Sequence, residues 1–309
     1  MAQQSSYTEL IKLASLKYES KSYLESGMLY AEAFQNFPQE IKTNDRYNAA
    51  CSWALAKQND SAFVQLKHLE EMGYSDLNQL NKDPDLATLR AAVQWENIRI
   101  GIAGNREKER SKYNQELLVL LDSIYLSDQV YRKQLDSVEK TFGRTTKEYK
   151  LHWVKIKEAD SVNLIKVEAI LAKHGWLGAD SIGKEGNRTL FLVIQHASIE
   201  TQEKYLPMMQ AAARRGDANL SSVALLEDRI NLSRGRKQVY GSQIAKHPET
   251  GLFYVLPLED PDHVDKRRAE VGLGPLSEYL ARWKMTWDVE EYKRNLPSYM
   301  AILDARFGR

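Results

Sequence analysis

The chain has 309 residues, of which 43% are hydrophobic and 28% are charged, and these fractions are typical of a folded globular protein rather than a disordered one. Its 43 lysines and arginines balance 42 aspartates and glutamates, so the net charge of +1 gives no reason to expect a nucleic-acid-binding surface. A single cysteine, Cys51, excludes an intrachain disulfide and a zinc site built from several cysteines.

The N-terminal residues and the hydropathy bear on the compartment. No apolar run reaches the roughly 18 residues that a membrane-spanning helix needs, so we expect no membrane span. The segment MAQQSS is similar to a start methionine placed before a mature chain whose export signal was removed at an alanine site. We therefore favour a periplasmic or secreted protein. A cytoplasmic N-terminus is the alternative, because one unpaired cysteine suits either compartment.

The first third of the chain predicts a helical repeat. Two segments match at a fixed offset, and their small and large residues recur at spacings that let antiparallel helices interlock: Ser26, Tyr30 and Ala33 align with Ala62, Leu66 and Leu69. These residues resemble tetratricopeptide-like repeats. The segment Tyr47–Ile98, with its DPDL sequence at Asp83–Leu86, resembles the unit that ends such arrays. We expect residues 1–104 to form this domain and to dock a protein or peptide partner.

Within the DPDL sequence, Asp83 or Asp85 is expected to cap a short helix, with Pro84 in the first turn, where proline forfeits no hydrogen bond. Farther along, Gly101 and Gly104 interrupt the helical pattern. We therefore place the domain boundary after residue 104 and expect residues 105–309 to form a second, helical domain.

Two long helices open the second domain, at about residues 111–143 and 146–173. In the first, Asp128 and Arg132 lie four residues apart, with Gln129 beside them. This spacing fits either a solvent-exposed ion pair or an inward-facing polar cluster. In the second, Asp160 and Asn163 lie three residues apart and share a face.

The apolar run LFLVI (Leu190–Ile194) leads into Gln195 and His196 and is compatible with a buried strand or a buried helix. We predict a helix, because the pattern around it is long enough for one. A further helix contains Asp228 and Arg229.

Beyond this helix the period of the pattern changes. KQVYGSQIA and LFYVLPLED alternate as strands do, and HPETG between them reads as a turn, so we predict a β-hairpin near residues 237–258. On a regular strand Gln238, Tyr240 and Ser242 would share one face, with Gln243 on the other. The predicted fold class is therefore mainly α: a tetratricopeptide-like repeat followed by a helical domain with one β-hairpin.

Separated motifs in the second domain resemble an uncharacterised bacterial family, a domain of unknown function. They are QHA at Gln195–Ala197, LEDRI at Leu226–Ile230, QVYGSQ at Gln238–Gln243, VDKRRAEVGLGPLSEYL at Val264–Leu280, and the shorter DQ-x-x-R, D-x-x-N and GW. Ser198 and Ser242 depart from the common form, in which an acidic residue and a threonine are usual. The resemblance implies a site without a reaction, since the family has no established activity.

Cofactor motifs are missing from the sequence. The six histidines include no pair at the i,i+4 spacing of a helical zinc site, and there is no phosphate-binding loop, dinucleotide fingerprint or G-x-S-x-G nucleophile motif. We therefore predict neither a metal nor a cofactor.

Three interpretations of the polar residues remain open: a buried hydrogen-bond network, a pocket for a small polar ligand, and a catalytic site. The leading prediction is a binding or scaffold protein with a polar ligand pocket in the second domain. Its binding residues would be Gln195, Arg229, Gln238, Tyr240, Gln243, Asp128, Gln129, Arg132, Asp160 and Asn163. The alternative is a hydrolase in which His196 acts as general base with a carboxylate partner, for which Asp228 is the first choice and Asp128 and Asp160 are the others. Whether the protein is an enzyme is left undecided by the sequence.

Overall fold

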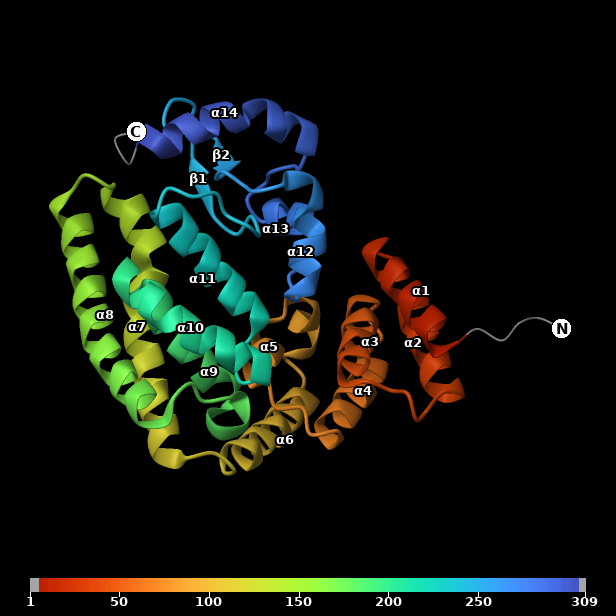
Figure 1. The fold of residues 1–309 in the computed structure, drawn as a ribbon. Coiled ribbons are helices and arrows are strands. Elements are labelled where there is room, and N and C mark those ends of the chain that lie inside the picture. Colours follow the sequence, from red (N-terminus) through yellow and green to blue (C-terminus); the bar gives the residue numbers. More distant parts are fainter. Residues whose placement is uncertain (1–5, 306–309) are drawn as a thin grey trace. The chain divides into compact units, whose positions relative to one another are not determined.

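The computed structural model describes residues 6–305, and the chain divides into two compact units, Met1–Lys112 and Tyr113–Arg309. We call them the N-terminal unit and the C-terminal unit. The described residues are mainly helical, with one small antiparallel sheet of two strands, as the sequence predicts (Figure 1). Of the six residues MAQQSS on which the export prediction rests, residues 1–5 lie outside the described range. Among residues 6–305, no helix combines the length and apolarity needed to cross a membrane.

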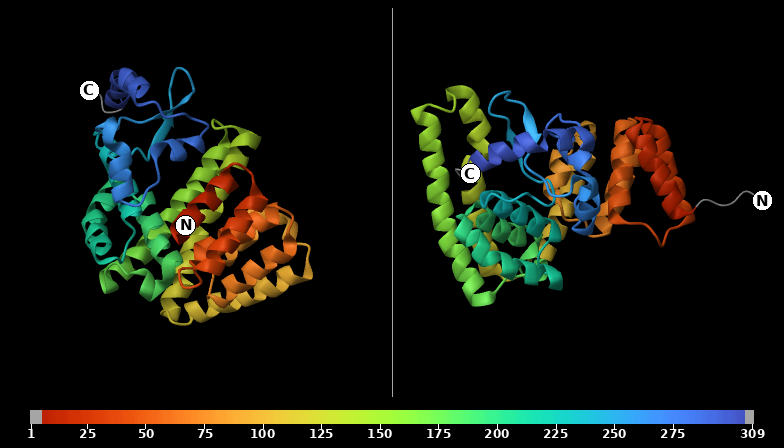
Figure 2. Two further views of the ribbon diagram at one scale, coloured as in Figure 1. Left: turned by 90° about the vertical axis from the view of Figure 1, so that its right-hand side faces the viewer. Right: turned by 45° about the horizontal axis from the view of Figure 1, so that its top comes forward.

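The first four helices of the N-terminal unit pack on one another in chain order, after which η1 packs on α3 and α6 packs on α4 and α5 (Figure 2). They are α1 (Tyr7–Glu19), α2 (Tyr23–Asn36), α3 (Thr43–Leu55), α4 (Asn59–Glu71), α5 (Leu77–Lys82), η1 (Pro84–Leu89) and α6 (Val93–Arg110). The residues that align at a fixed offset occupy the buried faces of α2 and α4. Small residues permit close packing: a Cβ atom on Gly27 would lie 2.7 Å from the ring of Trp53 on the neighbouring α3.

The DPDL sequence caps a helix as expected. Asp83 is the N-cap residue of η1 and accepts a hydrogen bond of 3.0 Å from the backbone N–H of Asp85, with Pro84 in the first turn.

Helix α6 runs through Gly101, Gly104 and Asn105, so these residues do not end a domain. Gly101 and Asn105 pack on α4. A Cβ atom on Gly101 would lie 2.2 Å from the side chain of Glu70, and Asn105 Nδ2 donates to the Glu70 carbonyl oxygen at 2.6 Å. The division between the units falls between residues 112 and 113, after α6 ends.

Five helices form the core of the C-terminal unit: α7 (Gln115–Phe142), α8 (Lys147–His174), α9 (Ala179–His196), α10 (Ile199–Arg215) and α11 (Leu220–Ser233). The long α7 and α8 lie side by side, α9 packs on both of them, and α10 packs between α9 and α11 (Figure 1). The LFLVI run is helical, and Leu190, Val193 and Ile194 are buried in this core. The buried run therefore forms the end of α9, and His196 is the C-terminal residue of this helix.

After α11 the chain forms β1 (Ile244–Lys246) and β2 (Phe253–Val255), in which Ala245 faces Tyr254. The rest comprises η2 (Pro261–His263), α12 (Val264–Glu270), α13 (Leu276–Ala281) and α14 (Val289–Ala305). The hairpin is shorter than predicted, because residues 239–243 are not in a strand. Gly241 has a φ of +69°, which breaks the strand that the alternating sequence predicts.

Candidate functional site

A histidine–carboxylate pair links the end of α9 to the middle of α7. His196 Nδ1 lies 2.9 Å from Asp128 Oδ1. Asp128 is only 1% exposed, whereas the His196 side chain retains 15% of its surface. Helix packing therefore buries the carboxylate and leaves the imidazole at the margin of the core.

Arg132 joins this pair to α8. One turn after Asp128, it donates to Asp128 Oδ1 at 3.2 Å and to the Asp128 carbonyl oxygen at 2.8 Å, and its second terminal nitrogen donates to Asp160 Oδ2 at 2.8 Å. Gln129 Nε2 donates to the other Asp128 oxygen at 2.6 Å. The structure thus shows the inward-facing arrangement of these residues. We call Asp128, Gln129, Arg132, Asp160 and His196 the His196 cluster.

The electrostatics fix the charge of Asp128. Burial opposes ionisation of its carboxyl, but the hydrogen bond and charge of His196, together with Arg132 and Gln129, outweigh burial and lower the pKa of Asp128. Because an ionised carboxylate only accepts hydrogen bonds, His196 Nδ1 must donate, and in a neutral ring Nε2 is then the acceptor. No other part of the described chain hydrogen-bonds to Nε2.

Several buried polar atoms beside the His196 cluster have no hydrogen-bond partner. They are Asp160 Oδ1, both amide atoms of Asn163, and Arg229 Nε. Asn163 is fully buried one turn after Asp160 on α8. Because most buried polar groups in proteins are paired, unsatisfied atoms in one region suggest that a bound group completes them.

The structure could also place a cation near this cluster, since ligand atoms of Asp128, Asp160 and His196 lie within 4.8 Å of one another. However, the Arg132 guanidinium already donates to both carboxylates. It therefore supplies the positive charge that an ion would bring, and the arrangement favours a protein ion pair over metal ligation.

Asp228 is not the carboxylate beside His196, contrary to the first choice made from the sequence. It is fully buried on α11 and accepts backbone hydrogen bonds from Val239 at 2.6 Å, Tyr240 at 2.9 Å and Ser242 at 2.9 Å. Burial raises the pKa of Asp228, against the opposite effect of these donors. Its carboxylate organises residues 239–242 into what we call the Asp228 loop.

The predicted glutamines of the QVYGSQ motif also have structural contacts. Gln238 is fully buried, and its Nε2 donates to the carbonyl oxygens of Leu256 at 2.8 Å and Gln243 at 3.0 Å. Gln243 Nε2 donates to the Ser242 hydroxyl at 3.0 Å. Gln195 offers its backbone carbonyl to Gln202 Nε2 at 3.1 Å.

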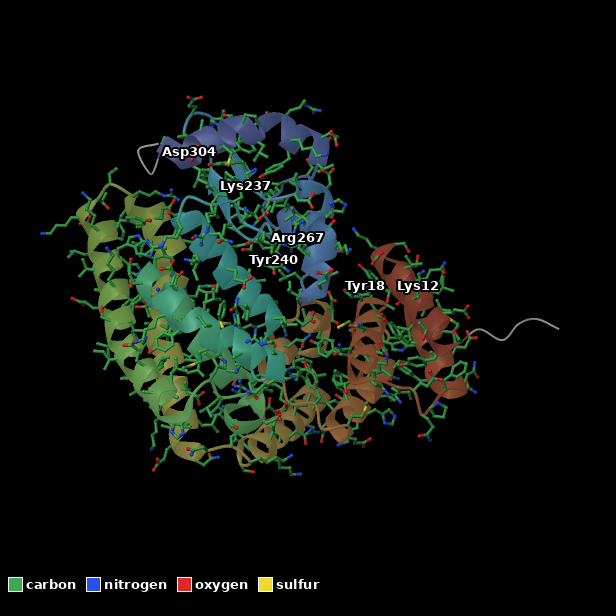
Figure 3. All side chains as sticks on the ribbon, viewed as in Figure 1. Lys12, Tyr18, Lys237, Tyr240, Arg267 and Asp304 are labelled. Atoms are coloured by element: carbon green, nitrogen blue, oxygen red, sulfur yellow. The ribbon has the colours of Figure 1, made fainter. Side chains whose placement is uncertain are left out.

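Three residues with clear roles at the Asp228 loop were not predicted. Arg268, which is 3% exposed, donates to the Tyr240 carbonyl oxygen at 2.7 Å, and Tyr279 donates to that of Ser242 at 2.8 Å. Arg267 donates to the Val239 carbonyl oxygen at 3.0 Å and lies beside Tyr240 (Figure 3). All three belong to the VDKRRAEVGLGPLSEYL stretch. The sequence identified this stretch as a family motif but did not indicate what its residues contact.

The predicted binding residues therefore separate into two groups. Asp128, Gln129, Arg132 and Asp160 meet at His196, whereas Gln238, Tyr240 and Gln243 belong to the surroundings of the Asp228 loop. Arg229 follows Asp228 directly on α11 and has Arg132 as its charged neighbour.

The N-terminal unit contains a cavity of about 360 Å³ whose lining includes Tyr18, Tyr47, Asp83 and Asp85. Tyr47 donates to Asp83 at 2.9 Å, and Tyr18, on α1 in Figure 3, donates to Asp85. Cys51 lies next to these carboxylates, but burial raises the pKa of its thiol, so it stays protonated and is a poor metal ligand. Partner docking by this unit stays a prediction.

Comparison with known proteins identifies a family for the C-terminal unit. No curated protein and no solved structure matches the chain. The profile of a family of unknown function, DUF6624, matches residues 112–290, which contain every residue of the His196 cluster and the Asp228 loop. The match covers more than half of the 309 residues and nearly all of the C-terminal unit up to α14. The chain therefore belongs to the DUF6624 family.

Proposed function

We propose that the C-terminal unit is a hydrolase in which His196 is the general base and Asp128, rather than Asp228, is its carboxylate partner. One observation carries the proposal: His196 Nδ1 is held by Asp128 at 2.9 Å, while Nε2 has no partner within the described chain. In known hydrolases, a carboxylate fixes the tautomer and orientation of the histidine that transfers a proton at neutral pH.

In this reaction Nε2 takes a proton from a water molecule as its oxygen attacks an acyl or phosphoryl centre of the substrate. The negative charge of Asp128 stabilises the resulting imidazolium. The bond to the leaving group then breaks, and the imidazolium returns the proton to that group. Water and one substrate thus give two products, and the histidine is regenerated.

Water is proposed as the nucleophile because Ser198 and Ser242, the serines of the two motifs, have other roles. Ser198 caps α10 and accepts from the backbone N–H of Thr201 at 3.3 Å. Ser242 is buried in the Asp228 loop, where its hydroxyl accepts from Gln243. Neither is hydrogen-bonded to His196, as an activated serine nucleophile would be.

The test is the hydrolysis of a panel of small carboxylic and phosphoric esters by the full chain and its variants. We expect His196→Gln to lower turnover by roughly 10²- to 10⁴-fold, because general base catalysis contributes about that much. His174→Gln is the matched control, since His174 is an exposed histidine at the end of α8. The proposal is wrong if His196→Gln hydrolyses every active substrate as fast as the unchanged chain does.

The ligand pocket predicted from the sequence is contained in this proposal, since a substrate must bind before it reacts. If ligands bind at the cluster and none is turned over, the site binds without chemistry, and the hydrolase proposal fails.

A further inference from the structure

Arg229 is a partly buried arginine with no counter-charge. It lies on α11, and its guanidinium forms neither an ion pair nor a hydrogen bond with any described residue. Its Nε atom is fully enclosed and unpaired. A cation removed from water without a partner is costly, so a fold retains one where something else binds it.

A neighbouring positive charge increases this cost. Burial lowers the pKa of Arg229, and the positive charge of Arg132 lowers it further. Arg132 is itself engaged, because it donates to both Asp128 and Asp160. The two carboxylates are therefore committed to Arg132, and Arg229 is left facing a like charge.

Further unpaired atoms lie on α8, which provides Asp160 to the His196 cluster. Asp160 binds Arg132 through Oδ2, while its Oδ1 is buried and unpaired. Asn163 shares a face of α8 with Asp160, is fully buried, and leaves both its amide oxygen and its amide nitrogen without partners. Asp160, the α8 partner of Arg132, thus has an unsatisfied oxygen, Asn163 lies one turn farther along α8, and Arg229 of α11 is an unsatisfied cation within reach of the charge of Arg132.

We propose that Arg229 binds the oxyanion of the substrate, a carboxylate or phosphate group, and that polar groups of the same molecule satisfy Asn163 and Asp160. The inference rests on the proposed function, since it names the substrate class of that site. A planar guanidinium presents parallel N–H donors that match two oxygens of such a group. The substrate would be a small organic acid or a phosphate ester that also carries a hydroxyl or amino donor for Asp160.

The roles of the residues then differ. Arg229 anchors the anionic end of the molecule, whereas His196 moves the proton. Removing Arg229 should therefore not harm folding. A neutral residue in its place relieves the repulsion with Arg132, so the free protein should be at least as stable as before.

The test measures anion binding to the full chain by thermal shift and by calorimetry. Inorganic phosphate and acetate are the probes, each compared with chloride at equal ionic strength. We expect phosphate or acetate, but not chloride, to raise the melting temperature, and Arg229→Gln to weaken that binding roughly tenfold or more. Arg234→Gln is the matched control, because Arg234 ends the same helix but is exposed and ion-paired with Glu203.

Binding of phosphate alone would identify a phosphate ester as the substrate class, and binding of acetate alone a carboxylic acid; both support the inference. Equal effects of chloride, or unchanged binding by Arg229→Gln, would overturn it. Should Arg229→Gln fail to fold, Arg229→Lys, which keeps the charge but loses the parallel donors, is measured instead. Weaker phosphate binding by Arg229→Lys supports the inference, and binding as tight as that of the unchanged chain overturns it. His196→Gln separates the two proposals: if it binds phosphate and the unchanged chain hydrolyses nothing, the anion site stands and the hydrolase does not.

Discussion

At the scale of single residues, the two aspartates Asp128 and Asp228 show how environment assigns roles. Both are buried on helices of the C-terminal unit. Asp128 meets charged side chains, which lower its pKa, whereas Asp228 meets backbone N–H groups in a more enclosed position, where burial raises its pKa. Asp128 is therefore an ionised partner of His196, whereas Asp228 holds the backbone of a loop in place.

The lowered pKa of Asp128 predicts how stability depends on pH. Because the folded-state pKa lies below the unfolded value of about 3.9, the ionised carboxylate stabilises the fold above that pH, and this contribution is lost as the pH falls through the folded pKa. Asp128→Asn should cost about 1–3 kcal/mol of unfolding free energy at neutral pH, through loss of charged hydrogen bonds, and less at pH 3, which lies below the unfolded pKa.

Urea unfolding at the two pH values measures this difference. Asp136→Asn is the control, because Asp136 is an exposed aspartate on the same helix and has no described partner. A cost of Asp128→Asn that stays equal at both pH values would contradict the ionised state assigned to Asp128.

At the scale of elements, helices were easier to predict than the segments between them. The LFLVI run could be assigned to a helix because its neighbours continued the helical period, and Leu190, Val193 and Ile194 are indeed core residues of α9. Gly101 and Gly104 misled, because they lie inside α6; at Gly101 a side chain would collide with Glu70. From the sequence alone, a glycine that is needed for close packing of two helices cannot be distinguished from one that is needed for a turn.

The alternating segment KQVYGSQIA shows a second limit. Its period predicts one strand, but only Ile244–Lys246 pairs with a partner strand. The preceding residues give their N–H groups to Asp228, a side chain that lies on another element. Hydrogen bonds to a side chain that is distant in the sequence replace strand pairing here, and such bonds leave no periodic pattern in the sequence.

The Asp228 loop should depend on this one carboxylate. In Asp228→Asn, the amide would offer one oxygen to three N–H donors and bring two donors of its own, so buried groups would be left unsatisfied. We expect a loss of about 2–3 kcal/mol or more in unfolding free energy and faster hydrogen exchange at the amides of Val239, Tyr240 and Ser242. Unchanged stability with lost hydrolysis would instead restore Asp228 as the catalytic partner.

At the scale of the whole molecule, the family match and the C-terminal unit begin at nearly the same residue, and the His196 cluster lies within both. The match begins at residue 112, and the unit begins at Tyr113. The sequence could name His196, Asp128, Arg132 and Asp160, because their motifs occur in order and their helical spacing puts the pairs on one face. It could not choose among the carboxylates, since that choice depends on how α7, α8 and α9 pack. Likewise, only the fold of the described residues reveals that Arg229 has no partner among them.

The central claim is that Asp128 holds His196 with Nε2 free to accept a proton. The protonation of the two ring nitrogens can be read from the ¹⁵N shifts and couplings of the His196 imidazole by NMR. In the neutral ring we predict a proton on Nδ1 and none on Nε2, and Asp128→Asn should weaken or reverse this preference. A neutral His196 that carries its proton on Nε2 in the unchanged chain would contradict the account, because Nδ1 would then have no hydrogen to donate to Asp128.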